Sequence, residues 1–279
     1  MSIDTNKKLI LFAIVGFCCL VAGANAQNRY RKLTFSDEFN GKKGTAVDQK
    51  KWTIEIGGKG WGNQELQYYT NSTDNASLDG KGNLVIKAVK LSPPLTLECW
   101  YGPCQYTSAR LITKGKFEQK YGKFEARIKV PRGQGVWPAF WMLGNNIDSV
   151  GWPACGEIDI MENIGREPAT VHGTIHGPGY SGEKSIGAPF DLAGNQKIAD
   201  DFHVFSTEWS ENRISFFVDG KHYKTLTPAD LPEGKKWVYD HPFFLLLNFA
   251  IGGSWGGNPD ATSVFPQEML IDYVRVYQP

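Results

Sequence analysis

The sequence predicts an all-β protein, a β-sandwich or jelly roll built from two antiparallel sheets. Many short runs of β-branched and aromatic residues are separated by Gly, Pro, Asn and Asp, which is typical of strands and turns. The chain contains 31 glycines. Apart from segment 193–202, no stretch keeps the 3.6-residue period of an amphipathic helix. These observations together favour packed antiparallel sheets over any helical or α/β class.

The clearest strand covers residues 123–130. Its apolar residues Phe124, Ala126, Ile128 and Val130 alternate with charged ones, as expected for a strand with one buried face. In segment 214–226, Asp219-Gly220 separates two strand-like runs and predicts a tight hairpin. Further strands are predicted at 83–89, 203–209, 243–251 and 269–277.

Residues 1–26 have the pattern of a secretory signal peptide. Lys7 and Lys8 precede a short apolar run that ends in "ANAQ", so we expect cleavage after Ala26. A membrane anchor would need a longer apolar run, and the bulky Phe17 before Cys18 disfavours a lipoprotein signal. We therefore expect a secreted or periplasmic protein. No linker or repeat interrupts residues 27–279, which we expect to form one domain.

Net charge and cysteine content limit the classes of partner and the cysteine chemistry that we expect. The formal net charge is +1, and losing residues 1–26, with two lysines and one aspartate, brings it to zero. A neutral chain without a basic block does not indicate binding to nucleic acid or to a membrane, and we expect a monomer. Cys99 and Cys104 flank a Gly-Pro turn that a disulfide could close, whereas Cys155 is expected to be a small buried residue.

Three carboxylates crowd the stretch "PACGEIDIMENIG", residues 153–165. On a regular strand Glu157 and Asp159 share one face, but Glu162 falls on the face of Ile158 and Ile160. Burying an ionised carboxylate there costs several kcal/mol. A β-bulge between Asp159 and Glu162 would return Glu162 to the face of the other two. The alternative is an exposed strand end with solvated acids.

Crowded carboxylates are what glycosidic hydrolysis requires, because one carboxyl must stay protonated while its neighbour is ionised. Trp61, Trp137 and Trp255 lie beside Gly or Pro in loops, where flat aromatic faces suit sugar rings. Packing in the core or in turns is the alternative for these tryptophans. The combination points to a carbohydrate-active protein.

Several motifs resemble those of glycoside hydrolase family 16, and "GEIDIMEN" is similar to its E-x-D-x-x-E signature. The resemblance covers nearly all of residues 27–279 and is closest to the laminarinase branch. It implies a jelly roll with a substrate cleft on its concave face and a retaining endo-β-1,3-glucanase. The lichenase branch has a shorter signature, whereas agarases and carrageenases share this spacing. The other matching motifs are "FSDEFNG", "WGNQELQYYT", "YTSARLIT", "GVWPAFWMLG", "VHGTIHGPGYSG", "FHVFSTEW", "AIGGSWGG" and "IDYVRVY".

The resemblance also implies residue roles. Glu157 is expected to be the nucleophile, Glu162 the general acid and base, and Asp159 a hydrogen-bonding partner that tunes the nucleophile. No cofactor is implied for catalysis. The implied substrate contacts are Trp61, Asn63, Glu65, Arg110, Trp137, Trp141, His176 and Trp255, with His172 the less favoured of the two histidines. A structural calcium ion is implied at Glu38, Gly80 and Asp272.

Two alternatives remain open. A non-catalytic β-glucan-binding protein on the same scaffold would lack the catalytic carboxylates, whereas all three are present here. The sequence also leaves open a preference for mixed-linkage glucan or agar over β-1,3-glucan.

Overall fold

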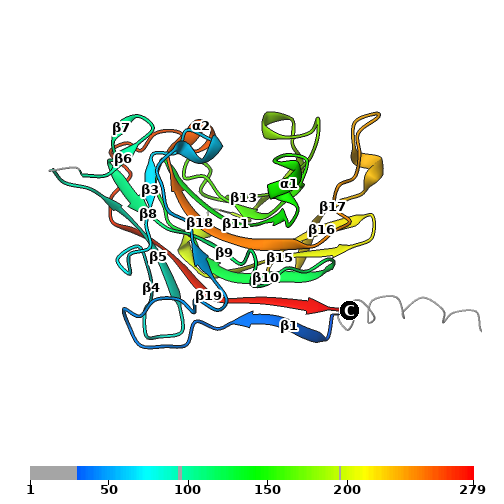
Figure 1. Ribbon diagram of the computed structural model, residues 1–279, viewed down its shortest axis with the longest axis horizontal. Coiled ribbons are helices and arrows are strands. Elements are labelled where there is room, and N and C mark those ends of the chain that lie inside the picture. Colours follow the sequence, from blue (N-terminus) through cyan, green and yellow to red (C-terminus); the bar gives the residue numbers. More distant parts are fainter. Residues whose placement is uncertain (1–29, 94–95, 195) are drawn as a thin grey trace, which may run out of the picture.

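The computed structural model describes residues 30–93, 96–194 and 196–279, so the predicted signal peptide lies outside the described residues. The described chain is almost entirely β, and two large sheets are stacked face to face (Figure 1). Helices are limited to single turns, and none of those described has the length and apolarity needed to cross a membrane. They are α1 (Ile147–Val150), α2 (Gly253–Gly256), η1 (Gly60–Gly62), η2 (Gly182–Lys184), η3 (Ile198–Asp200) and η4 (Pro228–Asp230).

The larger sheet has ten strands. Their order is β17 (Lys221–Leu226), β16 (Arg213–Val218), β15 (His203–Ser210), β10 (Gly122–Lys129), β19 (Gln267–Gln278), β5 (Leu84–Lys90), β8 (Tyr106–Ser108) and β3 (Gln67–Tyr69), while β1 (Lys32–Asp37) pairs with β19 and β4 (Ala76–Leu78) with β5. All these pairs are antiparallel except β3 with β8.

The smaller sheet has seven strands and is antiparallel throughout. Their order is β14 (Ile186–Asp191), β13 (Thr170–His176), β12 (Glu157–Glu162), β11 (Val136–Gly144), β18 (Phe243–Ile251), β9 (Arg110–Ile112) and β2 (Thr53–Ile54). A separate hairpin is formed by β6 (Glu98–Cys99) and β7 (Gly102–Pro103). The predicted all-β sandwich is confirmed.

The local predictions hold where they are clearest. Strand β10 buries Phe124, Ala126 and Ile128, as the alternation indicates. Strands β16 and β17 form the predicted hairpin, and Asp219 and Gly220 at its turn have φ of 49° and 74°. Positive φ at both central residues is the geometry that favours Asp-Gly in two-residue turns. The described residues of segment 193–202 contain only the single turn η3.

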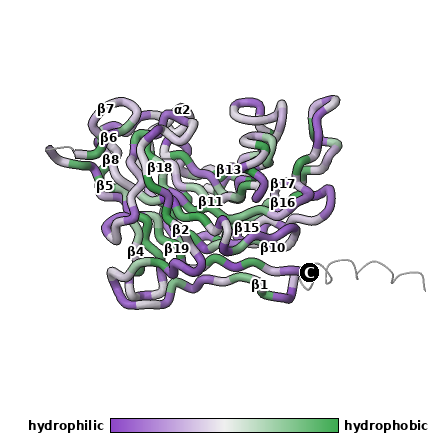
Figure 2. The backbone as a smooth tube through the Cα atoms, in the orientation of Figure 1, coloured by the Kyte–Doolittle hydropathy of each residue, from purple (hydrophilic) through white to green (hydrophobic). Residues whose placement is uncertain are grey.

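The main hydrophobic core fills the space between the two sheets. Phe124 from β10 and Leu247 and Phe249 from β18 are each completely buried in it. In Figure 2 the hydrophobic segments follow the stacked strands and the hydrophilic ones follow the outer loops. This core fixes the smaller sheet rigidly, so its opposite face can serve as a stable platform for a site.

The cysteine predictions are confirmed. Cys99 and Cys104 form a disulfide that closes the β6–β7 hairpin. Cys155 is free and completely buried, and burial raises the pKa of its thiol to about 11. A buried thiol with a raised pKa is a poor nucleophile, so Cys155 acts as a small core residue.

Candidate active site

A β-bulge in β12 brings the three carboxylates to one face. Along β11, Phe140 pairs with Met161 but the next residue, Trp141, pairs with Asp159, so one residue of β12 is extra. Ile160 and Met161 both enter the core between the sheets. Glu157, Asp159 and Glu162 therefore all reach the opposite face of the sheet, as the sequence predicts.

That face carries a cleft of about 820 Å³. The three carboxylates line it, and so do all eight residues predicted to contact substrate, which come from loops and strands far apart in the sequence. The predicted contacts in the cleft are Trp61, Asn63, Glu65, Arg110, Trp137, Trp141, His176 and Trp255. Their convergence on one hollow is what a binding role for these residues requires.

The cleft floor runs across the strands. One paired row contains His172 on β13, Glu162 on β12, Ala139 on β11, Asn248 on β18 and Arg110 on β9. All five residues line the cleft. Four strand spacings of about 4.8 Å give the row a length of about 19 Å, which suits an extended chain molecule better than a compact ligand.

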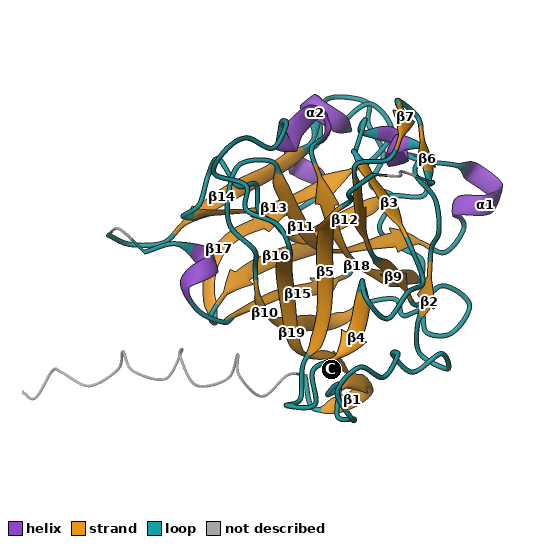
Figure 3. Ribbon diagram, turned by 90° about the vertical axis from the view of Figure 1, so that its left-hand side faces the viewer, coloured by secondary structure: helices purple, strands orange, loops and turns teal. Residues whose placement is uncertain are grey.

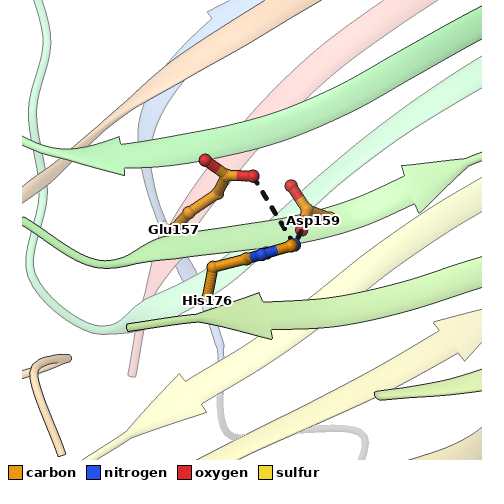
Figure 4. A group of neighbouring side chains, drawn as sticks. All are labelled: Glu157, Asp159 and His176. Atoms are coloured by element: carbon orange, nitrogen blue, oxygen red, sulfur yellow. Dashed lines mark ion pairs between the residues drawn. The ribbon is translucent and has the colours of Figure 1, made fainter. Parts of the chain in front are cut away.

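The Glu157 carboxylate is held by two neighbours. The indole Nε1–H of Trp152 donates to Glu157 Oε2 at 2.7 Å. His176 Nε2 lies 3.7 Å from Glu157 Oε1 and 3.0 Å from Asp159 Oδ2, so it stands between the two acids (Figure 4). The Trp152 hydrogen bond favours a negative charge on Glu157 over one on a carboxyl without such a partner.

His176 is held in one tautomer by a loop. The backbone N–H of Gly182 donates to His176 Nδ1 at 3.1 Å, so Nδ1 carries no proton. The proton of the neutral ring is then on Nε2, facing the carboxyl groups. The oxygen and nitrogen atoms of Glu157, Asp159 and His176 are close enough to suggest a metal site. A protonated Nε2 cannot be a metal ligand, so this cluster is better suited to proton chemistry.

Glu162 has a different set of neighbours. Trp137 Nε1–H donates to Glu162 Oε1 at 3.0 Å. Trp137 also packs edge-to-face with Trp255, at 5.4 Å between ring centroids, and Trp255 in turn packs against His172. His172 is fixed by Glu167, whose Oε2 lies 2.7 Å from its Nε2. The end of the cleft beside Glu162 is therefore a rigid aromatic wall.

Burial raises the pKa of all three carboxyls. The pKa of Glu157 is raised to about 8 by burial and by the charge of Asp159, and that of Glu162 to about 7 by burial, with His176 and Trp137 opposing the shift. Burial also raises the pKa of Asp159 well above its usual value, and the charge of Glu162 adds to this. The cluster consequently keeps protons near neutral pH, as general acid catalysis requires.

A buried network supports the cleft behind the carboxylates. Glu65 is 4% exposed and accepts hydrogen bonds from the side chains of Asn63, Gln67 and Tyr69. Burial is the main reason that the pKa of Glu65 is raised. Asn248 links this network to the cleft, since it donates to the Tyr69 hydroxyl and accepts from a cleft indole, Trp141. Glu65 thus fixes the loop that carries Asn63.

Arg110 lies between two indole rings. Its guanidinium carbon is 4.8 Å from the ring centre of Trp61 and 4.9 Å from that of Trp141. Its Nε is 2.5 Å from Glu55 Oε2. The cation–π contacts and the ion pair together hold both aromatic faces in place at this end of the row.

Several residues of the cleft were not predicted from the sequence. Trp152 was not singled out, although it sits beside Gly and Pro like the other loop tryptophans, so the same signal could have identified it. Asn248 is the one polar residue in the apolar run 243–251, which is also a usable signal. His172 lines the cleft alongside the preferred His176. Ser254 and Thr174 also line it, and their sequence context gives no comparable signal.

The residues predicted to hold calcium have other partners. Both oxygens of Glu38 accept hydrogen bonds from Arg275, which is the main cause of the lowered pKa of Glu38. Asp272 Oδ2 is 2.7 Å from Arg127 Nη1. The two carboxylates are already paired with cations, so these side chains as arranged do not fit a calcium ion. Calcium binding at Glu38, Gly80 and Asp272 stays a prediction.

Comparison with known proteins agrees with this site. The family model "Glycosyl hydrolases family 16" matches residues 63–275. The chain is 39% identical to a β-glucanase of Rhodothermus marinus over 98% of this chain and 94% of that protein. It is 50% identical to the laminarinase catalytic domain of Thermotoga maritima MSB8, with a TM-score of 0.81 over 90% of this chain and 99% of that one.

An endo-β-1,3-glucanase of Pyrococcus furiosus is 48% identical, with a TM-score of 0.81 over 88% of this chain and 94% of that chain. The matched region contains the three carboxylates and all the residues that line the cleft except Trp61 and Gly62. The protein is therefore a glycoside hydrolase, and the chain belongs to glycosyl hydrolases family 16.

Proposed function

We propose that this protein is an exported endo-glycosidase that hydrolyses β-1,3-glucosidic bonds of laminarin-like β-glucans with retention of configuration. The observation that carries the proposal is the bulge in β12, which places Glu157, Asp159 and Glu162 together on the floor of the cleft. The similarity to laminarinases and endo-β-1,3-glucanases supports the substrate class.

Glu157 is the nucleophile. Its carboxylate attacks the anomeric carbon and forms a covalent glycosyl-enzyme, while Glu162 donates its proton to the departing glycosidic oxygen. Glu162 is then a carboxylate and takes a proton from the water that releases the sugar, which restores both residues. Trp152 supports this assignment because it donates to Glu157 and stabilises the charge of the resting nucleophile.

Asp159 holds a proton next to the nucleophile. Its carboxyl shares a hydrogen bond with Glu157, its side chain is 3% exposed, and His176 Nε2 lies 3.0 Å from its Oδ2. Glu157 has the Trp152 indole donor and is less buried than Asp159, so a shared proton is more stable on Asp159. A protonated Asp159 donates to Glu157 and keeps it ionised for attack.

Two further features support an exported endo-acting enzyme. The row of five strands gives the cleft room for several consecutive sugar units, so cleavage within a chain is favoured. The Cys99–Cys104 disulfide indicates folding in an oxidising compartment, in agreement with the predicted signal peptide.

Azide rescue tests the roles of the two glutamates. The substrate is a dinitrophenyl β-laminaribioside, whose leaving group needs no protonation. Glu162→Ala with azide should give the β-glycosyl azide, because azide attacks the glycosyl-enzyme in place of water. Glu157→Ala with azide should give the α-glycosyl azide, because azide replaces the nucleophile. The opposite pair of products would exchange the two roles, and unchanged activity in both variants would refute the proposal.

A substrate comparison tests the specificity. Reducing-sugar release is measured on laminarin, curdlan, lichenan and agarose at equal mass concentration. Laminarin should be cleaved fastest, with oligosaccharides of mixed length as early products. Preferential cleavage of agarose or lichenan would identify that polysaccharide, and not a β-1,3-glucan, as the substrate.

A further inference from the structure

The β6–β7 hairpin presents a tryptophan that the cleft does not use. Trp100 is 49% exposed and does not line the cleft, although its hairpin stands on the rim of the molecule near α2 (Figures 1 and 3). About half of Trp100 is therefore open to solvent and free to contact a ligand.

The hairpin is fastened to the loop that carries the cleft residues. Trp100 donates its backbone N–H to Gly58 O at 2.9 Å and its indole N–H to Glu65 O at 2.8 Å. Tyr101 donates its hydroxyl to Leu66 O at 2.7 Å. The Cys99–Cys104 disulfide closes the hairpin between these contacts.

The orientation of the Trp100 ring is therefore fixed before any ligand arrives. Its polar N–H is already bonded to Glu65 O, so the ring presents only apolar surface to solvent. A side chain held in one orientation loses little conformational entropy on binding. This is the arrangement expected of a rigid stacking platform.

Trp100 also lies next to one end of the cleft. It packs directly over Gly60, where a Cβ atom would lie 3.0 Å from Trp100 Cδ1. The next residue, Trp61, lies over Arg110 at the end of the row that crosses the smaller sheet. The Trp100 hairpin therefore stands beside the end of the cleft that Trp61 occupies.

We propose that Trp100 forms an outer subsite that stacks against one sugar ring of a β-glucan chain, beyond the units held in the cleft. The proposal rests on the proposed polysaccharide substrate. Stacking uses the apolar C–H face of the sugar and needs no charged partner. A single fixed ring fits a sugar unit better than it fits a protein partner, which requires a contiguous apolar patch of several hundred Å².

The test compares two variants on long and short substrates. Trp100→Leu keeps apolar bulk but removes the flat ring, and Trp100→Phe keeps a flat ring without the indole N–H. For Trp100→Leu we expect the KM for laminarin to rise about fivefold, with kcat unchanged and no change on a dinitrophenyl β-laminaribioside. Trp100→Phe should stay close to wild type on both substrates.

Two results would overturn the subsite. One is a wild-type KM for laminarin in Trp100→Leu, and the other is an equal loss of activity on the short substrate, which would show that Trp100 only supports the loop. Electrophoresis through gels containing laminarin measures binding separately from hydrolysis. If wild type binds laminarin without hydrolysing it and Trp100→Leu binds it less, the outer subsite is supported and the proposed hydrolysis is refuted. If wild type neither binds nor hydrolyses laminarin, both proposals fall.

Discussion

Replacing Trp152 by Phe removes one hydrogen-bond donor from the proposed nucleophile and keeps an aromatic ring in the same place. The donor atom, Nε1, is 2.7 Å from Glu157 Oε2. A hydrogen bond to an ionised group contributes about 1.5–3 kcal/mol. Trp152 is half exposed, so water replaces part of the lost bond, and we take the lower end of that range. This corresponds to a rise of about one unit in the pKa of Glu157.

The sign of the effect follows from the roles. The nucleophile must be ionised, and its pKa of about 8 lies above that of the general acid, so only a fraction of the enzyme has both groups in the reactive state. A higher pKa of Glu157 therefore lowers activity at low and neutral pH and leaves activity at high pH unchanged. The general acid must be protonated, so activity is lost as pH rises through the pKa of Glu162, which is about 7. Trp137→Phe removes the donor to Glu162, which raises the pKa of that carboxyl, and should increase activity at high pH without changing it at low pH.

The assay is kcat/KM for laminarin from about pH 4 to about pH 10. Trp152→Phe should lower kcat/KM about tenfold below about pH 7 and leave it close to wild type above about pH 9. Trp61→Phe is the matched control, because its indole N–H donates to Gly57 O and contacts neither glutamate. The proposed role of Trp152 is refuted if Trp152→Phe lowers kcat/KM equally at both ends of this range, or if the Trp61 control changes the ratio of low-pH to high-pH activity as much.

Three further predictions concern stability and binding. Glu157→Gln should raise the thermal midpoint above that of wild type by several degrees at pH 9 but not at pH 4. The reason is that a carboxyl whose pKa is raised to about 8 destabilises the fold as pH rises toward that value. An equal difference between variant and wild type at both pH values would contradict this. Replacing both Cys99 and Cys104 by Ser should lower the unfolding free energy by about 2 kcal/mol, measured by urea titration, and should raise the KM for laminarin as Trp100→Leu does; full stability without the bridge would be contrary evidence. Arg110→Met should raise the KM for laminarin about tenfold with a smaller change in kcat, since Trp61 and Trp141 lose the cation between them, and Lys123→Met, remote from the cleft, is its control.

Local patterns in the sequence were enough to predict the fold class and the strand face on which the three carboxylates lie. The alternation in 123–130 and the Asp-Gly turn at 219–220 depend on neighbours a few residues apart, and both appear as expected. The bulge in β12 was predictable for the same reason, because an unbroken strand would have buried Glu162. The disulfide spans a separation of only five residues, so sequence proximity indicated it too.

The contacts that tune the site were not predictable in this way. The sequence alone did not indicate that Trp152 would donate to Glu157, or that Gly182 would fix the tautomer of His176. The predicted calcium ligands illustrate the same point. The pairing of β1 with β19 places Glu38 beside Arg275, which is 237 residues away in the sequence.

The sequence by itself thus determined that the three carboxylates share one face of their strand. The tertiary structure decided which donor reaches each carboxyl, how the cleft floor crosses five strands, and where Trp100 stands relative to Trp61. The physical reason is that these contacts depend on the pairing register of distant strands, as between Trp141 and Asn248, 107 residues apart. Side-chain alternation within one strand does not encode that register.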